Sequence, residues 1–164
     1  MNDQTRGFTL IEVLVVIFLI GIISAIATPN ILSWRSNAKL RGAATNLKND
    51  LELAKLKAIQ ENGWVAVNFT ENGYMVFKDD GGGLQGVHDP NEDLYGSRSL
   101  PAGVKIDLGE TTFADDGQGG QYTRFSGKGT ANDGTAHLVN SSGTKKRVVI
   151  NVLGRIKIES GEAT

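Results

Sequence analysis

The pattern of hydrophobic positions changes twice along this chain, and each change predicts a boundary. Residues 8–27 form an almost unbroken apolar run with one acid, Glu12, near its start. From residue 40 to residue 58, apolar residues recur at spacings of three and four, the period of one helix face. After Gly63, short runs of Val, Ile, Phe and Tyr alternate with Gly- and Asp-rich segments, as in antiparallel strands. The pattern predicts a long N-terminal helix followed by β-strands.

The apolar run predicts a membrane-spanning helix over residues 8–28. Such a helix would be about 31 Å long, which matches a hydrocarbon core of roughly 30 Å. A cleavable secretory signal is the alternative, because Ala25-Ile26-Ala27 offers a small-x-small cleavage site. Against it, the run is longer than a usual signal core, contains Glu12, and follows a leader in which Asp3 offsets Arg6.

Glu12 is the residue on which the functional interpretation depends. An acid inside a membrane-length helix costs roughly 3 kcal/mol on insertion scales, so it is a functional hypothesis by default. The alternative is that Glu12, close to the start of the run, simply reaches the headgroup region.

The helix is expected to continue over residues 29–62. Pro29 removes a backbone hydrogen bond and predicts a kink near the bilayer surface. One apolar stripe follows, made of Leu40, Ala44, Leu47, Leu51, Ala54 and Ala58. A stripe of this kind predicts a buried helix face, and Gly63 fits a C-terminal cap.

Residues 63–164 are expected to form a β-sheet domain. Thr70-Glu71-Asn72-Gly73 predicts a hairpin turn between strands 64–69 and 74–77. Further strands are expected over residues 104–108, 122–125, 135–140, 145–151 and 155–158, with long loops over 78–99 and 114–121. Both faces of 145–151 carry apolar residues, which favours an inner strand. The fold class is therefore α+β, a long N-terminal helix packed on antiparallel sheets in a lollipop arrangement.

Composition excludes several classes of function. The formal net charge is −1, so no bulk attraction to nucleic acid is expected, and the absence of cysteine means that the core must fold without disulfides. His88 and His137 are the only histidines, and no catalytic or zinc-binding set surrounds them in the sequence. We therefore expect neither an enzyme nor a bound cofactor.

Two ligand motifs in the loop over residues 78–99 are incomplete. Gly81, Gly83 and Gly86 match G-x-G-x-x-G, but no helix start follows to bind a pyrophosphate. Residues 89, 91 and 93 offer alternating calcium ligands, yet the turn glycine and the bidentate glutamate are missing. No metal site is predicted, although calcium binding and ordering of this loop on assembly stay open.

Arg-Gly-Phe-Thr-Leu-Ile-Glu-Val-Leu at 6–14 resembles the class III signal of type IV pilins and type II secretion pseudopilins. The resemblance implies that prepilin peptidase removes residues 1–7 by cutting between Gly7 and Phe8, and that Phe8 becomes N-methylated. It also implies that Glu12 pairs with the N-terminal amine of a neighbouring subunit. The implied location is the bacterial inner membrane, with one span and a periplasmic C-terminal domain that is later extracted into a pseudopilus.

The C-terminal half resembles the end of the GspH/FimT family. The similar segments are Phe125-Ser126-Gly127-Lys128-Gly129, Gly134–Leu138, Val148–Asn151 and Gly154–Ile158. The resemblance implies a minor pseudopilin of a type II secretion system, assembled with other pseudopilins and an inner-membrane assembly platform. The alternative is a FimT- or FimU-like minor type IV pilin that primes pilus assembly.

A basic cluster near the C-terminus admits two interpretations. It consists of Lys145, Lys146, Arg147, Arg155 and Lys157, on two expected strands joined by a tight turn. Such charges commonly protect an exposed sheet edge. Alternatively they bind DNA phosphates, as some FimT-like minor pilins do in DNA uptake. No aromatic residues are interleaved, and the net charge is negative, so DNA contact is not expected.

Overall fold

The computed structural model describes the backbone of residues 8–161 and the side chains of 8–25 and 31–161. The predicted leader 1–7, including Gly7, lies outside the described residues. The chain divides into two compact units, Met1–Arg35 and Ser36–Thr164. We refer to them as the N-terminal and C-terminal units. One helix, α1, spans Leu10–Glu61 and contributes to both.

Helix α1 ends in a turn that differs from the predicted one. Asn62 adopts a left-handed conformation, with φ of 48°, and Gly63 donates its N–H to the carbonyl of Ala58 at 3.1 Å. Asn62 also donates to the carbonyl of Ile59 at 3.3 Å, which completes a Schellman motif. The prediction that Gly63 caps the helix was therefore wrong by one residue, because asparagine also tolerates the left-handed region.

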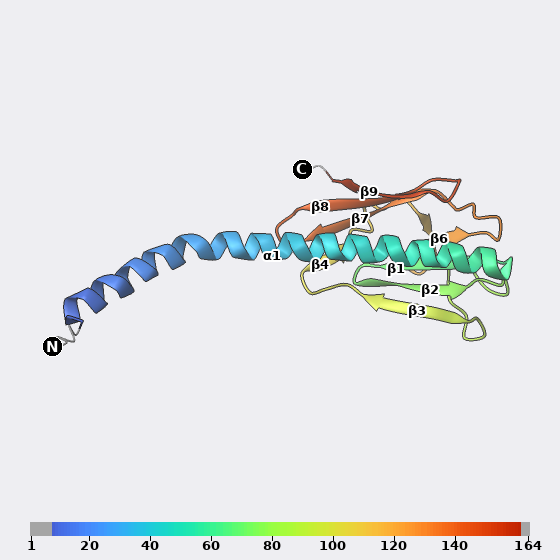
Figure 1. Ribbon diagram of the computed structural model, residues 1–164. Helices are drawn as coiled ribbons and strands as arrows, with labels where there is room; N and C mark the ends of the chain where they lie inside the picture. Colours follow the sequence, from blue (N-terminus) through green and yellow to red (C-terminus); the bar gives the residue numbers. More distant parts are fainter. Residues whose placement is uncertain (1–7, 162–164) are drawn as a thin grey trace, which may run out of the picture. The chain divides into compact units, whose positions relative to one another are not determined.

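The C-terminal unit contains two antiparallel sheets (Figure 1). The first has the order β3-β2-β1-β6-β5, and the second has the order β4-β7-β8-β9. The strands are β1 Val65–Thr70, β2 Gly73–Lys78, β3 Leu94–Ser99, β4 Val104–Ile106, β5 Ala114–Asp115, β6 Gln121–Phe125, β7 Gly134–Asn140, β8 Lys145–Ile150 and β9 Ile156–Ser160.

The core lies between α1 and both sheets. Every member of the predicted stripe is buried, and Leu47, Leu51 and Ala58 are fully inaccessible. These side chains join one cluster with residues of the first sheet, such as Phe69, and of the second sheet, such as Val148. The stripe was thus predicted correctly, because its period of three to four residues matches one face of a helix.

The predicted hairpin and inner strand are confirmed, whereas the two predicted loops each conceal a strand. Thr70 pairs with Gly73 around the turn of β1 and β2, and β8 lies between β7 and β9. The expected loop over 78–99 contains β3, an edge strand that is mostly exposed and has few apolar residues. The expected loop over 114–121 contains β5, which is only two residues long. Neither strand carries the alternation that marks a half-buried strand.

The remaining part of the first loop, residues 79–93, covers the face of the first sheet that points away from α1. Gly86 lies against the ring of Tyr122, and a Cβ built at Gly86 would come within 2.0 Å of that ring. Asp79 accepts the N–H of Gly86 at 3.2 Å and lies 3.2 Å from the buried Arg124. The loop is therefore held by packing and by a buried ion pair within the C-terminal unit.

Candidate assembly surface

Thr9 and Glu12 form the start of helix α1. The Glu12 N–H donates to the Thr9 side-chain oxygen at 3.3 Å and to its carbonyl at 3.1 Å, so Thr9 is the N-cap. A Glu three residues after a Thr N-cap is the capping-box pattern. We had not predicted this role for Thr9, although Thr-x-x-Glu before an apolar run is its sequence signal. Glu12 also carries its charge in the first turn, where the helix dipole favours an acid.

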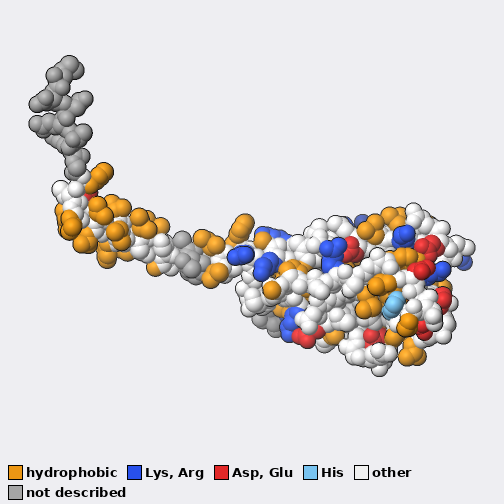
Figure 2. Space-filling model, turned by 90° about the horizontal axis from the view of Figure 1, so that it is seen from below, with side chains coloured by type: hydrophobic (Ala, Val, Ile, Leu, Met, Phe, Trp, Pro, Cys, Tyr) orange, Lys and Arg blue, Asp and Glu red, His pale blue; other side chains and the backbone are white. Residues whose placement is uncertain are grey.

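The N-terminal part of α1 exposes its apolar side chains on all sides. Leu10 is 84% exposed, Phe18 65% and Ile23 67%, and the large apolar residues from 8 to 23 are all at least 45% exposed. Figure 2 shows this segment, beside the grey residues at the left, covered with apolar side chains. Soluble monomers rarely expose an apolar surface of this extent, so the segment needs an apolar environment or partner.

Across the described residues, no helical stretch combines the length and apolarity that a bilayer crossing requires. The span predicted for 8–28 and the kink at Pro29 remain predictions, and the side chains of residues 26–30 are outside the description.

The five basic residues of the C-terminal cluster are spread over different surroundings. Lys146 donates to the Ser160 hydroxyl at 2.9 Å, and Arg147 lies 3.5 Å from Glu159 on the neighbouring strand. Lys157 pairs with Val149 in the register and is exposed, as is Arg155 in the turn before β9. Arg147 is thus partly neutralised by the neighbouring strand, and both interpretations of the cluster, edge protection and DNA contact, stay predictions.

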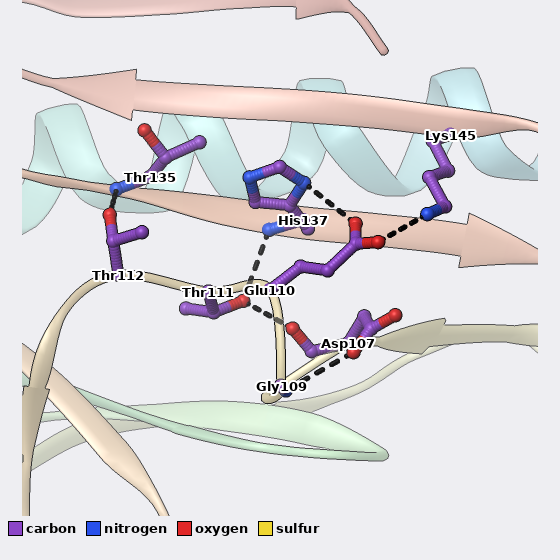
Figure 3. Close-up of polar contacts among 8 residues, drawn as sticks. All are labelled: Asp107, Gly109, Glu110, Thr111, Thr112, Thr135, His137 and Lys145. Carbon is purple, nitrogen blue, oxygen red and sulfur yellow. Dashed lines mark hydrogen bonds and ion pairs between the residues drawn. The ribbon is translucent and has the colours of Figure 1, made fainter. Parts of the chain in front are cut away.

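Lys145 belongs to a small polar network on the outer face of the second sheet (Figure 3). Glu110, from the segment after β4, reaches both Lys145 and His137, with 3.3 Å between its carboxylate and His137 Nδ1. The Thr111 hydroxyl donates to the Asp107 carbonyl at 2.7 Å and accepts the N–H of His137 at 3.2 Å. The network fastens the segment 107–112 to β7, which is a structural role.

Residues of the incomplete calcium motif bind to their own loop. Asp89 accepts two hydrogen bonds from Asn91, at 3.0 and 3.1 Å, and its N–H donates to Glu92. Glu92 is buried and also accepts the N–H of Asp80 at 3.2 Å. No three acidic or histidine side chains gather as metal ligands anywhere in the described part of the chain.

The glycines of the C-terminal motif have packing roles. A Cβ at Gly127 would lie 2.8 Å from Asn62, and one at Gly154 would lie 2.2 Å from the carbonyl oxygen of Gly129. Gly129 and Gly154 also have positive φ. These glycines therefore let three segments pack closely: the end of α1, the segment after β6 and the β8–β9 turn. The motif thus indicates the fold and not a ligand-binding site.

Comparison with known families identifies the family to which this chain belongs. Residues 43–154 match the family "Type II transport protein GspH", and residues 3–28 match the "Prokaryotic N-terminal methylation motif". The first match covers more than half of the chain, so the protein belongs to the GspH family. This is a family of structural pilin and pseudopilin subunits, whose members assemble with other pilins.

Individual relatives are pilin-like as well. The chain is 32% identical to Pilin-like protein PilA1 of Thermus thermophilus, over 94% of this chain and 98% of that one. It is 49% identical to the Type IV major pilin protein PilA of Myxococcus xanthus over 47 residues, 29% of this chain but only 21% of that pilin.

Two solved structures share the fold. The minor pseudopilin EpsH of the Vibrio cholerae Type 2 Secretion System has a TM-score of 0.56 and covers 76% of this chain and 99% of its own. The type IV minor pilin FimU of Pseudomonas aeruginosa also has a TM-score of 0.56 and covers 79% and 98%. Both are 14% identical to this chain, which establishes the pilin-like fold and nothing finer.

Proposed function

We infer that this protein is a minor pseudopilin that assembles into the short periplasmic pseudopilus of a type II secretion system. The observation that carries this proposal is the exposed apolar segment of α1, which begins after the N-cap Thr9, carries Glu12 in its first turn and leads into a folded domain. A surface of this kind is stable in a bilayer or among the same segments of neighbouring subunits. Membership of the GspH family and the methylation motif support the proposal.

Glu12 is the proposed docking residue. After cleavage between Gly7 and Phe8, the new N-terminal amine of one subunit would lie near the Glu12 carboxylate of its neighbour. An unpaired charge in lipid is costly, so pairing the two stabilises the assembled state and selects one axial position. The apolar side chains around Glu12, such as Ile11 and Val16, are 64% and 49% exposed and are free to pack on the neighbouring helix.

A minor type IV pilin that primes pilus assembly is the second candidate. It is favoured by the similarity to FimU, which equals that to EpsH, and by the full-length relative PilA1. Both candidates use the same helix and Glu12. Deleting the gene distinguishes them: loss of protein export with intact pili supports the first, and loss of pili with intact export supports the second.

The docking role is tested by Glu12→Val and Glu12→Gln in the full chain. Both variants should insert into the membrane normally, because each removes a charge from the segment. Both should lose co-purification with other pilin-like subunits. Ile17→Val is the matched control and should behave as the wild type. Normal co-purification of both Glu12 variants would contradict the proposed docking.

Intact-mass analysis of the same samples should show a methylated Phe8 as the N-terminus, whereas an N-terminus at Thr28 would identify a secretory signal.

A further inference from the structure

The part of α1 that begins the C-terminal unit carries positive charges without negative ones. Residues 13–49 contain four Lys and Arg residues and no Asp or Glu. Three of the four belong to the C-terminal unit, namely Lys39, Arg41 and Lys48. We call these three residues the proximal cations. On the face drawn in Figure 2, Lys and Arg side chains lie without Asp or Glu beside them where α1 enters this unit.

The proximal cations are not neutralised by the described part of the chain. None of the three forms an ion pair with a described carboxylate. Lys39 donates to the carbonyl of Ala102 at 3.1 Å, which leaves its charge in place. Asp50, the first acid that follows them, already accepts hydrogen bonds from Tyr74 and Arg98, each at 2.7 Å. The beginning of the C-terminal unit therefore presents a net positive charge to its surroundings.

Arg41 and Lys48 lie on one side of the helix. Their separation in the sequence corresponds to about 700° of rotation and about 10 Å along the axis, so their side chains project only about 20° apart. Thr45 lies between them along the same side and, like Arg41, is exposed. Two positive charges spaced along a helix suit an extended anionic surface better than a single small anion.

Charge of the opposite sign gathers near the other end of the C-terminal unit. The loop over residues 79–93 contains five Asp and Glu residues and no Lys or Arg. Among the described residues, only Asp79 of these five is paired with a Lys or Arg side chain, namely Arg124. The Asp79 N–H donates to the carbonyl of Trp64 at 3.0 Å, shortly after α1 ends at Glu61, so the loop starts beside the C-terminal end of the helix. An anionic surface therefore attracts the end with the proximal cations and repels the other.

The sequence position of the proximal cations favours a lipid surface over other anionic partners. They follow Ile31, Leu32 and Trp34, the last large apolar residues of the N-terminal unit, which are 59%, 61% and 68% exposed. Tryptophan is enriched at the membrane–water interface, and Lys and Arg next to a membrane segment are attracted by anionic headgroups. Cations near a span normally favour the cytoplasmic side. In the periplasmic location of the proposed function they work against insertion, so a favourable contact on that side accounts for their presence.

We propose that the proximal cations bind the anionic phospholipid headgroups at the periplasmic surface of the inner membrane. The inference rests on the proposed function, because the membrane and the location of the C-terminal unit come from it. Each Lys or Arg close to such a surface strengthens the attraction about fivefold, and the attraction fades beyond roughly 8–10 Å. The contact therefore holds the C-terminal unit at the membrane while the subunit waits for assembly, and it is weak enough to break when the subunit is extracted.

A fluorescent probe tests the contact, because the native chain contains no cysteine that would compete for the label. Full-length T45C is labelled and reconstituted into phosphatidylcholine vesicles that contain a nitroxide-headgroup lipid, with or without phosphatidylglycerol. Phosphatidylglycerol should increase the quenching of the probe beside Arg41 and Lys48, and high salt should reverse the increase. N91C, labelled at an exposed position of the loop over residues 79–93, is the distal control and should show no increase.

The double variant R41Q/K48Q, made in the T45C chain, should lower the ratio of docked to undocked C-terminal units roughly 25-fold. R155Q/K157Q removes the same net charge from two other exposed positions. It is the matched control and should behave as T45C alone. Quenching that does not depend on phosphatidylglycerol, or an equal loss of quenching in both double variants, would overturn the proposal.

All these variants keep Glu12, so their co-purification with other pilin-like subunits reports separately on the proposed function. Normal co-purification without any effect of phosphatidylglycerol would refute only the lipid contact. Loss of co-purification in R41Q/K48Q, again without an effect of phosphatidylglycerol, would assign the proximal cations to an acidic partner subunit and would also overturn the lipid contact.

Discussion

The two parts of helix α1 bury their apolar residues in opposite ways. Between residues 8 and 23 the large apolar side chains are all at least 45% exposed, and they surround the helix. Between residues 40 and 58 one stripe of apolar residues is buried, with Leu40, Leu47 and Leu51 at most 1% exposed, while Leu53 and Leu56 lie off the stripe and are 58% and 54% exposed. The stripe of the second part packs against the two sheets, whereas the first part has no covering element among the described residues.

The two parts of the helix therefore contribute to different free energies: one to folding, the other to insertion into lipid or assembly with other subunits. The apolar stripe of residues 40–58 contributes to the folding of the C-terminal unit, because it is buried within the chain. The apolar residues of the first part contribute to folding hardly at all, and their burial must come from lipid or from neighbouring subunits. Substitutions in the two parts should therefore be detected by different experiments.

Leu47→Ala should have the largest effect on stability. The side chain is fully buried against both sheets, and removing it leaves a cavity that costs about 2–5 kcal/mol of unfolding free energy. Chemical denaturation of the full chain in detergent, followed by tryptophan fluorescence, measures it. Ile17→Ala, at a position 64% exposed, should leave the transition unchanged. A similar loss for both variants would contradict the division of roles.

Substitutions at the two ends of α1 should sharpen the same contrast. Asn62→Ala places a β-carbon without a polar group in the left-handed conformation and should cost the C-terminal unit about 1 kcal/mol. Asn62→Gly should be neutral or slightly stabilising.

Thr9→Ala removes an N-cap that contributes a similar stabilisation, about 1 kcal/mol, but its loss should only loosen the first helical turn. Hydrogen exchange separates the two, since the loss at Thr9 should stay local.

The smallest expected effect is a pH dependence confined to the C-terminal unit. Burial acts to raise the pKa of Asp116, but hydrogen bonds from Asn68 and from the N–H groups of Gln118 and Gly120 outweigh it and leave the pKa lowered. A lowered pKa in the folded state means that the stabilisation is present above about pH 4, the unfolded value, and is lost as the pH falls through the folded value. Asp116→Asn should flatten this acid limb in denaturation curves, whereas Asp133→Asn, at an exposed position, should not.

The features predicted from sequence were those set by a local period. The buried stripe of α1, the Asn-Gly hairpin and the inner strand β8 follow from spacing and turn chemistry within a few residues. Strand β3 was missed because its position depends on contacts with α1 far away in the sequence, such as Arg98 with Asp50. The buried pair of Asp79 and Arg124 was missed for the same reason.

The assembly role of Glu12 and the cleavage at Gly7 stay predictions, and the structure adds geometry that the sequence did not indicate. The leader motif pointed to Glu12, while the capping role of Thr9 was present in the sequence and overlooked. The basic cluster was predicted as one surface. The structure instead gives Lys145 and Arg147 acidic neighbours, and the Glu110 that reaches Lys145 comes from a segment whose path no local pattern indicates.

Strand β4 determines how cooperatively this domain can form. Its neighbours along the chain, β3 and β5, belong to the first sheet, but β4 pairs with β7 of the second. Ile106 in β4 also donates its N–H to the carbonyl of Glu71 in the first hairpin, so it joins both sheets. Neither sheet is built from one continuous stretch of chain. A growing polypeptide therefore leaves Ile106 uncovered until residues 134–140 have been made, and the two sheets reach their native state together, late in synthesis.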